Sequence, residues 1–250
     1  MFPNMVQFRG SVKERWHILY EDRHLLGIYK PAGITVQGAR RGEEGLLFRV
    51  REHLRRRYGG NPFLAPVHRL DKVTSGVVLF ARSEKAARRL AEAFREGEVR
   101  KVYVAVVEGR FPLSAGRLTH FLRWEEGSRR VRISEQPFPG AREAVTEFRV
   151  FFRSRELTGI LLFPETGRKH QLRAQLAREG HPVVGDRRYG SRRRTSCEGA
   201  ILLHALALSL EHPVKREPLF LFAPLPDYFP VSGPEPREVA RLLGHGQGAE

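Results

Sequence analysis

The sequence is poor in the residues that build several common kinds of site. Its 250 residues include one cysteine, Cys197, which excludes an intramolecular disulfide and a cysteine-rich zinc site. A chain with one cysteine fits a reducing compartment, so we expect a cytoplasmic protein without redox chemistry. Acidic residues are also in the minority, with 28 Asp and Glu against 44 Lys and Arg. The formal net charge at pH 7 is therefore +16.

Long apolar runs are missing as well. The longest, ILLHALALSL at 201–210, is too short to span a bilayer, and residues 1–16 lack the apolar core of a signal peptide. We therefore expect no membrane association. The 41% hydrophobic content suffices for a substantial core, and no repeat or linker divides the chain. We expect one catalytic domain at 1–230, then a short C-terminal helix and a disordered tail at 231–250.

The positive charge is carried mainly by arginine, with 37 Arg against 7 Lys. The planar guanidinium group can bind two phosphate oxygens at once and can stack on a base. Each neutralised phosphate also releases a counterion from a nucleic acid. The composition therefore favours a nucleic-acid partner over a membrane surface. The alternative is a general bias toward arginine on an ordinary solvated surface.

Hydrophobic periodicity predicts short strands interspersed with helices. Residues 18–33 predict two strands joined by a Glu-Asp-Arg turn, and residues 145–167 predict a hairpin. Apolar spacing further predicts helices at 45–60, 83–98 and 170–180 and strands at 76–81, 100–110 and 200–210. Because strands often follow one another directly, the pattern favours an α+β fold with a mixed, largely antiparallel central sheet flanked by helices.

Several familiar active-site patterns are absent. The chain has no Gly-x-Ser-x-Gly nucleophile motif and no glycine-rich phosphate loop. Its ten histidines show no His-Glu-x-x-His spacing, and no motif suggests a nicotinamide or flavin site. We therefore expect neither a metal nor a cofactor.

One acidic residue stands in a distinctive stretch, HRLDKVTSG at 68–76, just before a predicted buried strand. Taken alone, Asp71 fits a turn former acting through Thr74 and Ser75, the commoner role of a loop aspartate. Tyr103 on a predicted strand and Arg173 on a predicted helix are equally ordinary by themselves. Local chemistry leaves open whether Asp71 forms a turn or is a reagent.

In order along the chain, however, these segments resemble the RluA-type RNA pseudouridine synthases. HRLDKVTSG matches the signature that carries the family's aspartate, at Asp71 here. The other matching segments are IYKPAG at 28–33, RKVYVAVVEG at 100–109, TGRKHQLRAQLAREGHPVVGDRRYG at 166–190 and LLHALALSLEHP at 202–213. The resemblance extends over about residues 18–225. Its lysine-proline turn comes so early that we expect the catalytic domain alone, without the N-terminal RNA-binding domain of many relatives.

The resemblance implies the pseudouridine synthase fold with a basic active-site cleft. It implies that a monomer converts a specific uridine of structured RNA, either large-subunit ribosomal RNA or tRNA, to pseudouridine after base flipping. The implied catalytic residues are Asp71, Tyr103 and Arg173. The implied RNA-binding residues are His68, Arg69, Thr74, Lys169, His170, Gln171 and Leu172.

These residue types suit a reaction that breaks a bond from ribose to uracil and forms another. A carboxylate can act as a nucleophile or a base, so Asp71 is expected to act on the sugar, the base or the 2′ proton, and the sequence does not choose among them. Arg173 is expected to keep Asp71 ionised through a bidentate pair. Tyr103 is expected to stack on the flipped uracil and to accept the proton lost at C5.

Two positions depart from the family pattern. Lys169 stands where threonine or serine is usual, and Gln175 stands where a histidine is common. Both are expected to alter RNA contacts rather than chemistry. Further RNA binding is expected from the arginine-rich segments at 55–57, 129–132, 187–188 and 192–194. The alternatives are a noncatalytic RNA-binding or ribosome-assembly protein on the same fold, and a glycosidase that does not rejoin the base.

Overall fold

The computed structural model describes residues 16–38, 44–128 and 130–244. Expectations for residues 1–15, for Arg129 and for the tail at 245–250 lie outside the described residues. The chain folds as two compact units. Unit 1 contains residues 1–100, 205–227 and 234–250, and unit 2 contains residues 101–204 and 228–233.

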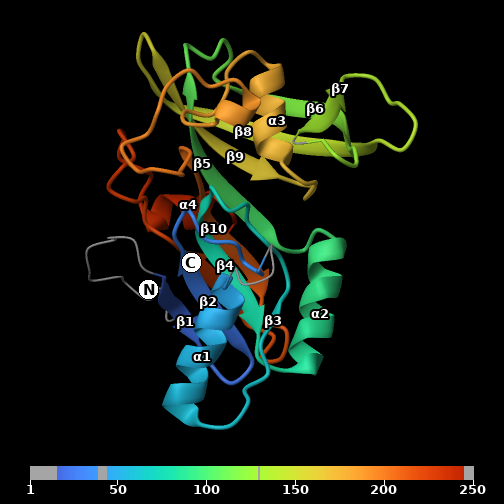
Figure 1. Cartoon of the computed structure of the whole chain (residues 1–250), viewed down its shortest axis with the longest axis vertical. Helices are drawn as coiled ribbons and strands as arrows, with labels where there is room; N and C mark the ends of the chain where they lie inside the picture. The colour runs from blue at the N-terminus through green and yellow to red at the C-terminus, as the bar shows by residue number, and fades with distance from the viewer. Residues whose placement is uncertain (1–15, 39–43, 129, 245–250) are drawn as a thin grey trace, which may run out of the picture. The chain divides into compact units, whose positions relative to one another are not determined.

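Unit 1 is built around a sheet in which β1, β2, β4 and β10 are neighbours in that order (Figure 1). Its strands are β1 (His17–Glu21), β2 (Leu25–Lys30), β3 (Ala65–Pro66), β4 (Ser75–Ala81), β10 (Leu203–Glu211) and β11 (Pro218–Phe222). The pairs β1/β2, β2/β4, β3/β4 and β10/β11 are all antiparallel. The predicted hairpin at 18–33 and the strand at 76–81 are confirmed.

Three helices belong to unit 1: α1 (Leu46–Tyr58), α2 (Glu84–Arg95) and α4 (Pro236–Leu242). Ser83 caps α2, because its side chain accepts a hydrogen bond from the Ala86 N–H, as the sequence predicts. Helix α1 buries Leu46 and two further leucine and valine side chains, whereas the predicted Leu47 is only half-buried. The short helix α4 begins on Pro236, which supplies a favourable first-turn backbone angle.

The core of unit 1 follows from these patterns. Every residue of β4 is buried, so this strand is a continuous apolar run rather than an alternating one. Ala86 and Leu90 of α2 pack in one cluster with Leu79 of β4 and Leu208 of β10. Full burial of such aliphatic side chains contributes about 1.5–3 kcal/mol each. The strand that follows HRLDKVTSG is therefore firmly fixed.

Unit 2 contains an antiparallel sheet in the order β5, β9, β8, β6, β7 (Figure 1). The strands are β5 (Arg100–Glu108), β6 (Ala115–Trp124), β7 (Val131–Ser134), β8 (Arg142–Arg153) and β9 (Leu157–Pro164). The hairpin predicted at 145–167 is confirmed as β8 and β9. The sequence did not indicate β6, because much of that strand is exposed and polar residues interrupt its apolar pattern.

Helix α3 (Gln171–Arg178) packs against the β6–β7–β8 part of this sheet. Ala174 of α3 joins Leu122, Val131 and Ala144 in a small apolar cluster. A 3₁₀ turn, η1 (Arg187–Tyr189), follows the helix. The two units together confirm the predicted α+β class with a largely antiparallel sheet. Among the described residues, the helices are all too short or too polar to cross a membrane.

Candidate functional site

Asp71 lies in unit 1, in the loop that leads into β4. Its carbonyl oxygen accepts a hydrogen bond from the Thr74 N–H at 3.1 Å, which closes a turn. The aspartate is half-buried, whereas Thr74 is 2% exposed and its hydroxyl oxygen has no hydrogen-bond partner among the described residues. The backbone of Asp71 therefore forms the turn that the local sequence indicates, and this bond uses its carbonyl oxygen rather than its carboxylate.

His68 fixes the beginning of this loop. Its Nε2 accepts a hydrogen bond from the Leu79 N–H at 2.9 Å, and its ring stacks on Phe94 of α2 with centroids 4.9 Å apart. These contacts support a role in holding the loop, where the sequence suggested RNA contact. The next residue, Arg69, is exposed.

Lys30 holds the loop on its other side, a relationship that the sequence did not indicate. The Lys30 side chain is fully buried, and its Nζ donates to the carbonyl oxygens of Pro31 and Ile34, each at 2.9 Å. Its Nζ also lies 3.5 Å from the Lys72 carbonyl oxygen, which accepts a 2.7 Å hydrogen bond from the Gly33 N–H. The lysine-proline turn thus holds the residue that follows Asp71.

Burial also changes the acidity of this lysine. Desolvation lowers the pKa of Lys30 to about 7, and the charge of Asp71 opposes the shift. A cation that is only partly protonated near neutral pH therefore lies within electrostatic range of the Asp71 carboxylate.

Gly76 explains the glycine of HRLDKVTSG. Its φ is +121°, a region that L-residues rarely adopt, and a Cβ at this position would collide with the backbone of Ala205 in β10. Only glycine lets β4 leave the Asp71 turn at this close approach.

Tyr103 and Arg173 belong to unit 2. Tyr103 lies in β5 opposite Leu162 of β9 and is half-buried. Arg173 lies on α3 and is 4% exposed. A catalytic arrangement of Asp71 with these two residues stays a prediction.

Within unit 2, the bidentate partner of Arg173 is Asp186, a residue that the sequence did not single out. Nε of Arg173 donates to Oδ2 at 2.6 Å and Nη2 donates to Oδ1 at 2.9 Å. Asp186 is 2% exposed, so this is a buried ion pair. The Arg173 guanidinium also lies 5.1 Å from the ring centroid of Tyr189. The acid of GDRRYG beside the arginine motif was the sequence signal for this pair.

The residues before α3 form a cluster of aromatic and cationic groups. His170 precedes the helix with φ of 54°, and its Nδ1 lies 2.8 Å from the Tyr189 hydroxyl group. That hydroxyl also accepts from the Val131 N–H at 3.1 Å. Lys169 extends over the ring of Trp124 in β6, with its Nζ 3.1 Å from the ring centroid. The predicted Lys169 and His170 are thus brought together.

Two buried glutamines attach α3 to the sheet. Nε2 of Gln171 donates to Val145 O and Thr146 Oγ1, each at 3.0 Å. Nε2 of Gln175 donates to the carbonyl oxygens of Leu118 and Ala144, and its Oε1 accepts from Thr146 Oγ1 at 2.7 Å. Both amides therefore anchor the helix, where the sequence suggested RNA contact. The neighbouring Leu172 is also buried.

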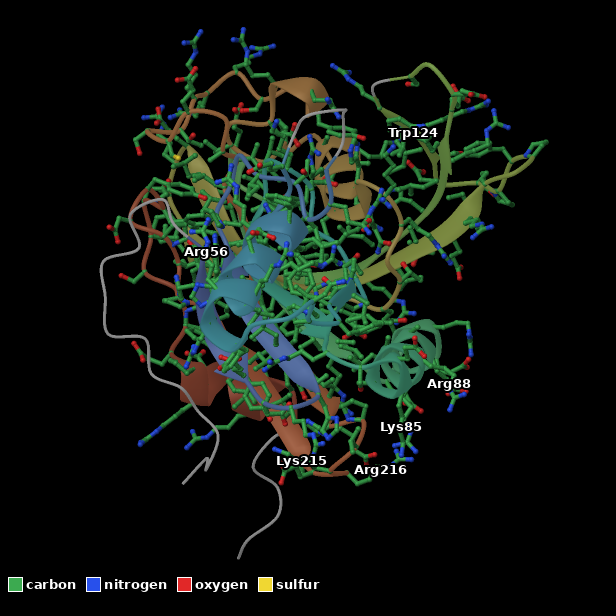
Figure 2. The ribbon with its side chains drawn as sticks, turned by 60° about the horizontal axis from the view of Figure 1, so that its bottom comes forward. Arg56, Lys85, Arg88, Trp124, Lys215 and Arg216 are labelled. Carbon is green, nitrogen blue, oxygen red and sulfur yellow. The ribbon has the colours of Figure 1, made fainter. Side chains whose placement is uncertain are left out.

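Basic side chains cover much of both units. In unit 1, Arg56 projects from α1, Lys85 and Arg88 from α2, and Lys215 and Arg216 from the β10–β11 turn (Figure 2). At the end of α1, Arg55 and Arg57 form exposed ion pairs with Glu52 and Glu21. In unit 2, the arginines of 187–188 and 192–194 are exposed. The predicted basic cleft stays a prediction.

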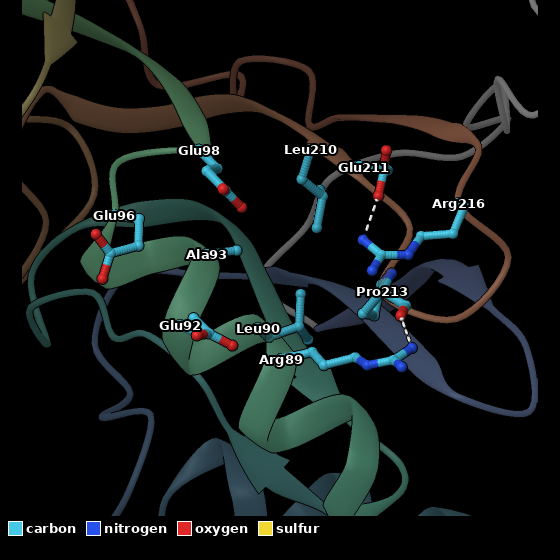
Figure 3. A pocket seen from close by; sticks show the side chains of 10 residues that line it. All are labelled: Arg89, Leu90, Glu92, Ala93, Glu96, Glu98, Leu210, Glu211, Pro213 and Arg216. Atoms are coloured by element: carbon cyan, nitrogen blue, oxygen red, sulfur yellow. Dashed lines mark hydrogen bonds and ion pairs between the residues drawn. The ribbon is translucent and has the colours of Figure 1, made fainter.

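A cavity of about 560 Å³ lies in unit 1 between α2 and the β10–β11 turn (Figure 3). It is lined by Arg89, Leu90, Glu92, Ala93, Glu96, Glu98, Leu210, Glu211, Pro213 and Arg216. Its two arginines bind the Pro213 carbonyl oxygen and the Glu211 carboxylate. None of the predicted site residues lines this cavity. Among the described residues, no group of three His, Cys, Asp or Glu side chains is placed to hold a metal ion.

Comparison with known proteins gives a consistent result. The family described as RNA pseudouridylate synthase matches residues 24–178. A protein of Buchnera aphidicola named ribosomal large subunit pseudouridine synthase C is 34% identical over 222 residues, covering 85% of this chain and 68% of that protein. Its namesake in Haemophilus ducreyi is 38% identical over 219 residues, covering 84% and 65%. The chain spans about two thirds of the length of these relatives.

Two solved human structures are also similar. RNA pseudouridylate synthase domain containing 1 gives a TM-score of 0.70 at 25% identity, covering 98% of this chain and 100% of that one. RNA pseudouridylate synthase domain containing 4 gives 0.69 at 27% identity, covering 85% and 89%.

Proposed function

Since the chain belongs to the RluA-type RNA pseudouridine synthase family, we propose that it isomerises a uridine of large-subunit ribosomal RNA to pseudouridine, with Asp71 as its catalytic aspartate. Ribosomal RNA is favoured over tRNA because the similar bacterial proteins are named for the large ribosomal subunit. The charge of +16 supports a polyanionic substrate of either kind.

The observation that carries this proposal is the fixed geometry of the Asp71 turn. His68 bonds the start of the loop to β4, and the lysine-proline turn bonds the Lys72 carbonyl oxygen. The close approach at Gly76 fixes where β4 begins. A reagent must be held in its productive geometry by surrounding contacts, and these three contacts restrain the loop on both sides of Asp71.

The reaction needs a carboxylate but no redox step. The bond from ribose C1′ to N1 of uracil breaks, the base turns, and a bond from C1′ to C5 forms. The C5 proton leaves, and N1 takes up a proton, so atoms balance. Asp71 serves as the nucleophile or base, and Tyr103 stacks on the uracil and accepts the C5 proton. Arg173 stabilises the ionised Asp71.

The target uridine must leave the RNA stack before any of these groups reaches its sugar. Arg69 is exposed beside Asp71, so its side chain can enter the RNA and fill the vacated position. Thr74 contributes a buried hydroxyl group that lacks a partner in the described residues and is available to bind substrate.

The test is an Asp71→Asn variant assayed on ribosomal RNA with tritium at C5 of uracil. We expect tritium release to disappear while RNA affinity stays within a few fold of wild type. Asp227→Asn is the matched control, because Asp227 is an exposed aspartate of the same unit and this change also removes one charge. Tritium release by Asp71→Asn at the wild-type rate would contradict the assignment.

The two alternatives give different results in the same assay. A noncatalytic RNA-binding protein on this fold would release no tritium even as wild type. A glycosidase would release free uracil, whereas an isomerase retains the base in the RNA. Modification of tRNA but not of ribosomal RNA would keep the chemistry and overturn the proposed substrate.

A further inference from the structure

Five exposed arginines are concentrated in one loop of unit 2. They are Arg187, Arg188, Arg192, Arg193 and Arg194. We propose that residues 186–194, the arginine loop, form a preorganised site for the RNA phosphate backbone, and that Glu108 at the end of β5 is the positioning residue that sets its shape. This inference rests on the proposed function, because it assumes that RNA is the substrate.

Glu108 binds the backbone of the loop rather than its cationic side chains. Its Oε1 accepts from the N–H groups of Arg192 and Arg193, each at 2.9 Å, and from Ser191 Oγ at 2.5 Å. Hydrogen bonds from two successive N–H groups to one carboxylate oxygen fix the local backbone direction. Because the carboxylate is used in this way, the guanidinium groups of Arg192 and Arg193 remain outside its hydrogen bonds.

A second set of contacts ties the loop to the body of unit 2. Ser191 Oγ accepts from the Gly185 N–H at 3.0 Å. The Asp186 carbonyl oxygen accepts from the N–H groups of Tyr189 and Ser191 at 2.9 and 3.1 Å. The Asp186 carboxylate forms the buried pair with Arg173. The arginine loop is therefore attached to the same residue that holds the predicted active-site arginine.

The charge of the loop points to phosphate. Only Arg193 of the five has a carboxylate within ion-pairing distance among the described residues, Glu156 at 2.9 Å. Arginine suits phosphate because its planar fork can grip two oxygens. A loop that is ordered before binding loses less conformational entropy when RNA arrives. A half-buried acid bound to the backbone of a cationic loop thus increases RNA affinity, although its own charge repels RNA.

This last point allows a sharp test with Glu108→Ala and Glu198→Ala in the full chain. Glu198 is an exposed acid just beyond the arginine loop, so both variants lose one negative charge. We expect Glu198→Ala to bind a large-subunit ribosomal RNA fragment at least as tightly as wild type. We expect Glu108→Ala to bind about tenfold more weakly, a loss of about 1.4 kcal/mol. Glu108→Gln keeps Oε1 as an acceptor and should restore most of the affinity.

The salt dependence of binding and a combined variant separate positioning from a general loss of structure. We expect the triple variant Arg192→Ala, Arg193→Ala, Arg194→Ala to lower the slope of log affinity against log salt by about 2–3, close to one per phosphate contact. Glu108→Ala should lower the same slope and raise KM more than it lowers kcat. Adding Glu108→Ala to the triple variant should change affinity little further, because both act through one loop.

Several results would overturn the proposal. They are tighter binding by Glu108→Ala, additive losses in the combined variant, or an unchanged salt slope in the triple variant, whose exposed substitutions should leave the fold intact. If the wild type modifies RNA and these variants bind like wild type, the arginine loop is wrong and the proposed function stands. If the variants lose RNA affinity as expected but the wild type forms no pseudouridine, the proposed function fails instead.

Discussion

Arg173 and Asp186 form a buried bidentate ion pair in which Nε and Nη2 of the arginine donate to the two carboxylate oxygens. Removing either partner leaves an uncompensated charge in the interior. We expect Arg173→Ala to lower the free energy of unfolding by about 3–5 kcal/mol, measured by urea denaturation. Lost activity in this variant therefore needs a stability measurement beside it.

The control for this prediction is Arg178→Ala on the same helix. Arg178 forms an exposed pair with Glu135 at 3.1 Å, and such pairs contribute about 0.2–1 kcal/mol. The double variant Arg173→Ala, Asp186→Ala should lose less than the two single losses added together. Equal stability losses in Arg173→Ala and Arg178→Ala would contradict the importance of the buried pair.

Lys30 makes stability depend on pH. Burial lowers its pKa to about 7 from the usual 10.5, so between these values the unfolded chain binds a proton that the folded chain releases. The free energy of unfolding should therefore rise from pH 7 toward pH 10, by at most about 1.4 kcal/mol per pH unit from this group. Below pH 7 both states are protonated and this contribution is constant.

Chemical denaturation at several pH values, compared between wild type and Lys30→Met, measures this contribution. The variant should lack the rise, so the difference between the two curves should change with pH above 7. Lys85→Met is the control, because Lys85 is exposed on α2. Parallel curves for wild type and Lys30→Met would show that Lys30 has its ordinary acidity in the folded protein.

Gly76→Ala should be strongly destabilising. The backbone conformation with φ of +121° costs about 1–3 kcal/mol for a residue with a Cβ, and the collision with Ala205 adds to this. Gly97→Ala isolates the conformational part, because Gly97 has φ of +77° but open space around it. Thermal unfolding should show a larger loss for Gly76→Ala, and equal losses would mean that β4 and β10 separate easily at this point.

Lys169 should influence which uridine is modified. Its Nζ lies over Trp124, an exposed platform on which a base can stack, and a surface cation–π contact is worth about 0.5–1 kcal/mol. We expect Lys169→Thr to change the pattern of pseudouridines mapped in total RNA more than turnover on a minimal stem-loop. Trp124→Leu should shift the pattern in the same way. An unchanged pattern in both variants would assign the contact to structure alone.

Local sequence determined much of the fold. The hairpins, the cap at Ser83 and the buried strand after HRLDKVTSG depend on periodicity, turn residues and caps within a few positions, so they could be predicted. The strand β6 could not, because its residues are mostly polar and its place depends on pairing with β7 and β8. The match of HRLDKVTSG to a family signature likewise identified Asp71 as a candidate from the order of residues alone.

Only the tertiary structure decided which charges are buried together. Lys30 reaches the carbonyl oxygen of Lys72 across 42 positions, and Glu108 reaches the N–H of Arg192 across 84. The bidentate partner of Arg173 is Asp186, 13 positions away. No local rule selects such partners, because a buried charge takes whichever group the packed chain places beside it. The sequence therefore indicated the reagent, and folding determined what holds it.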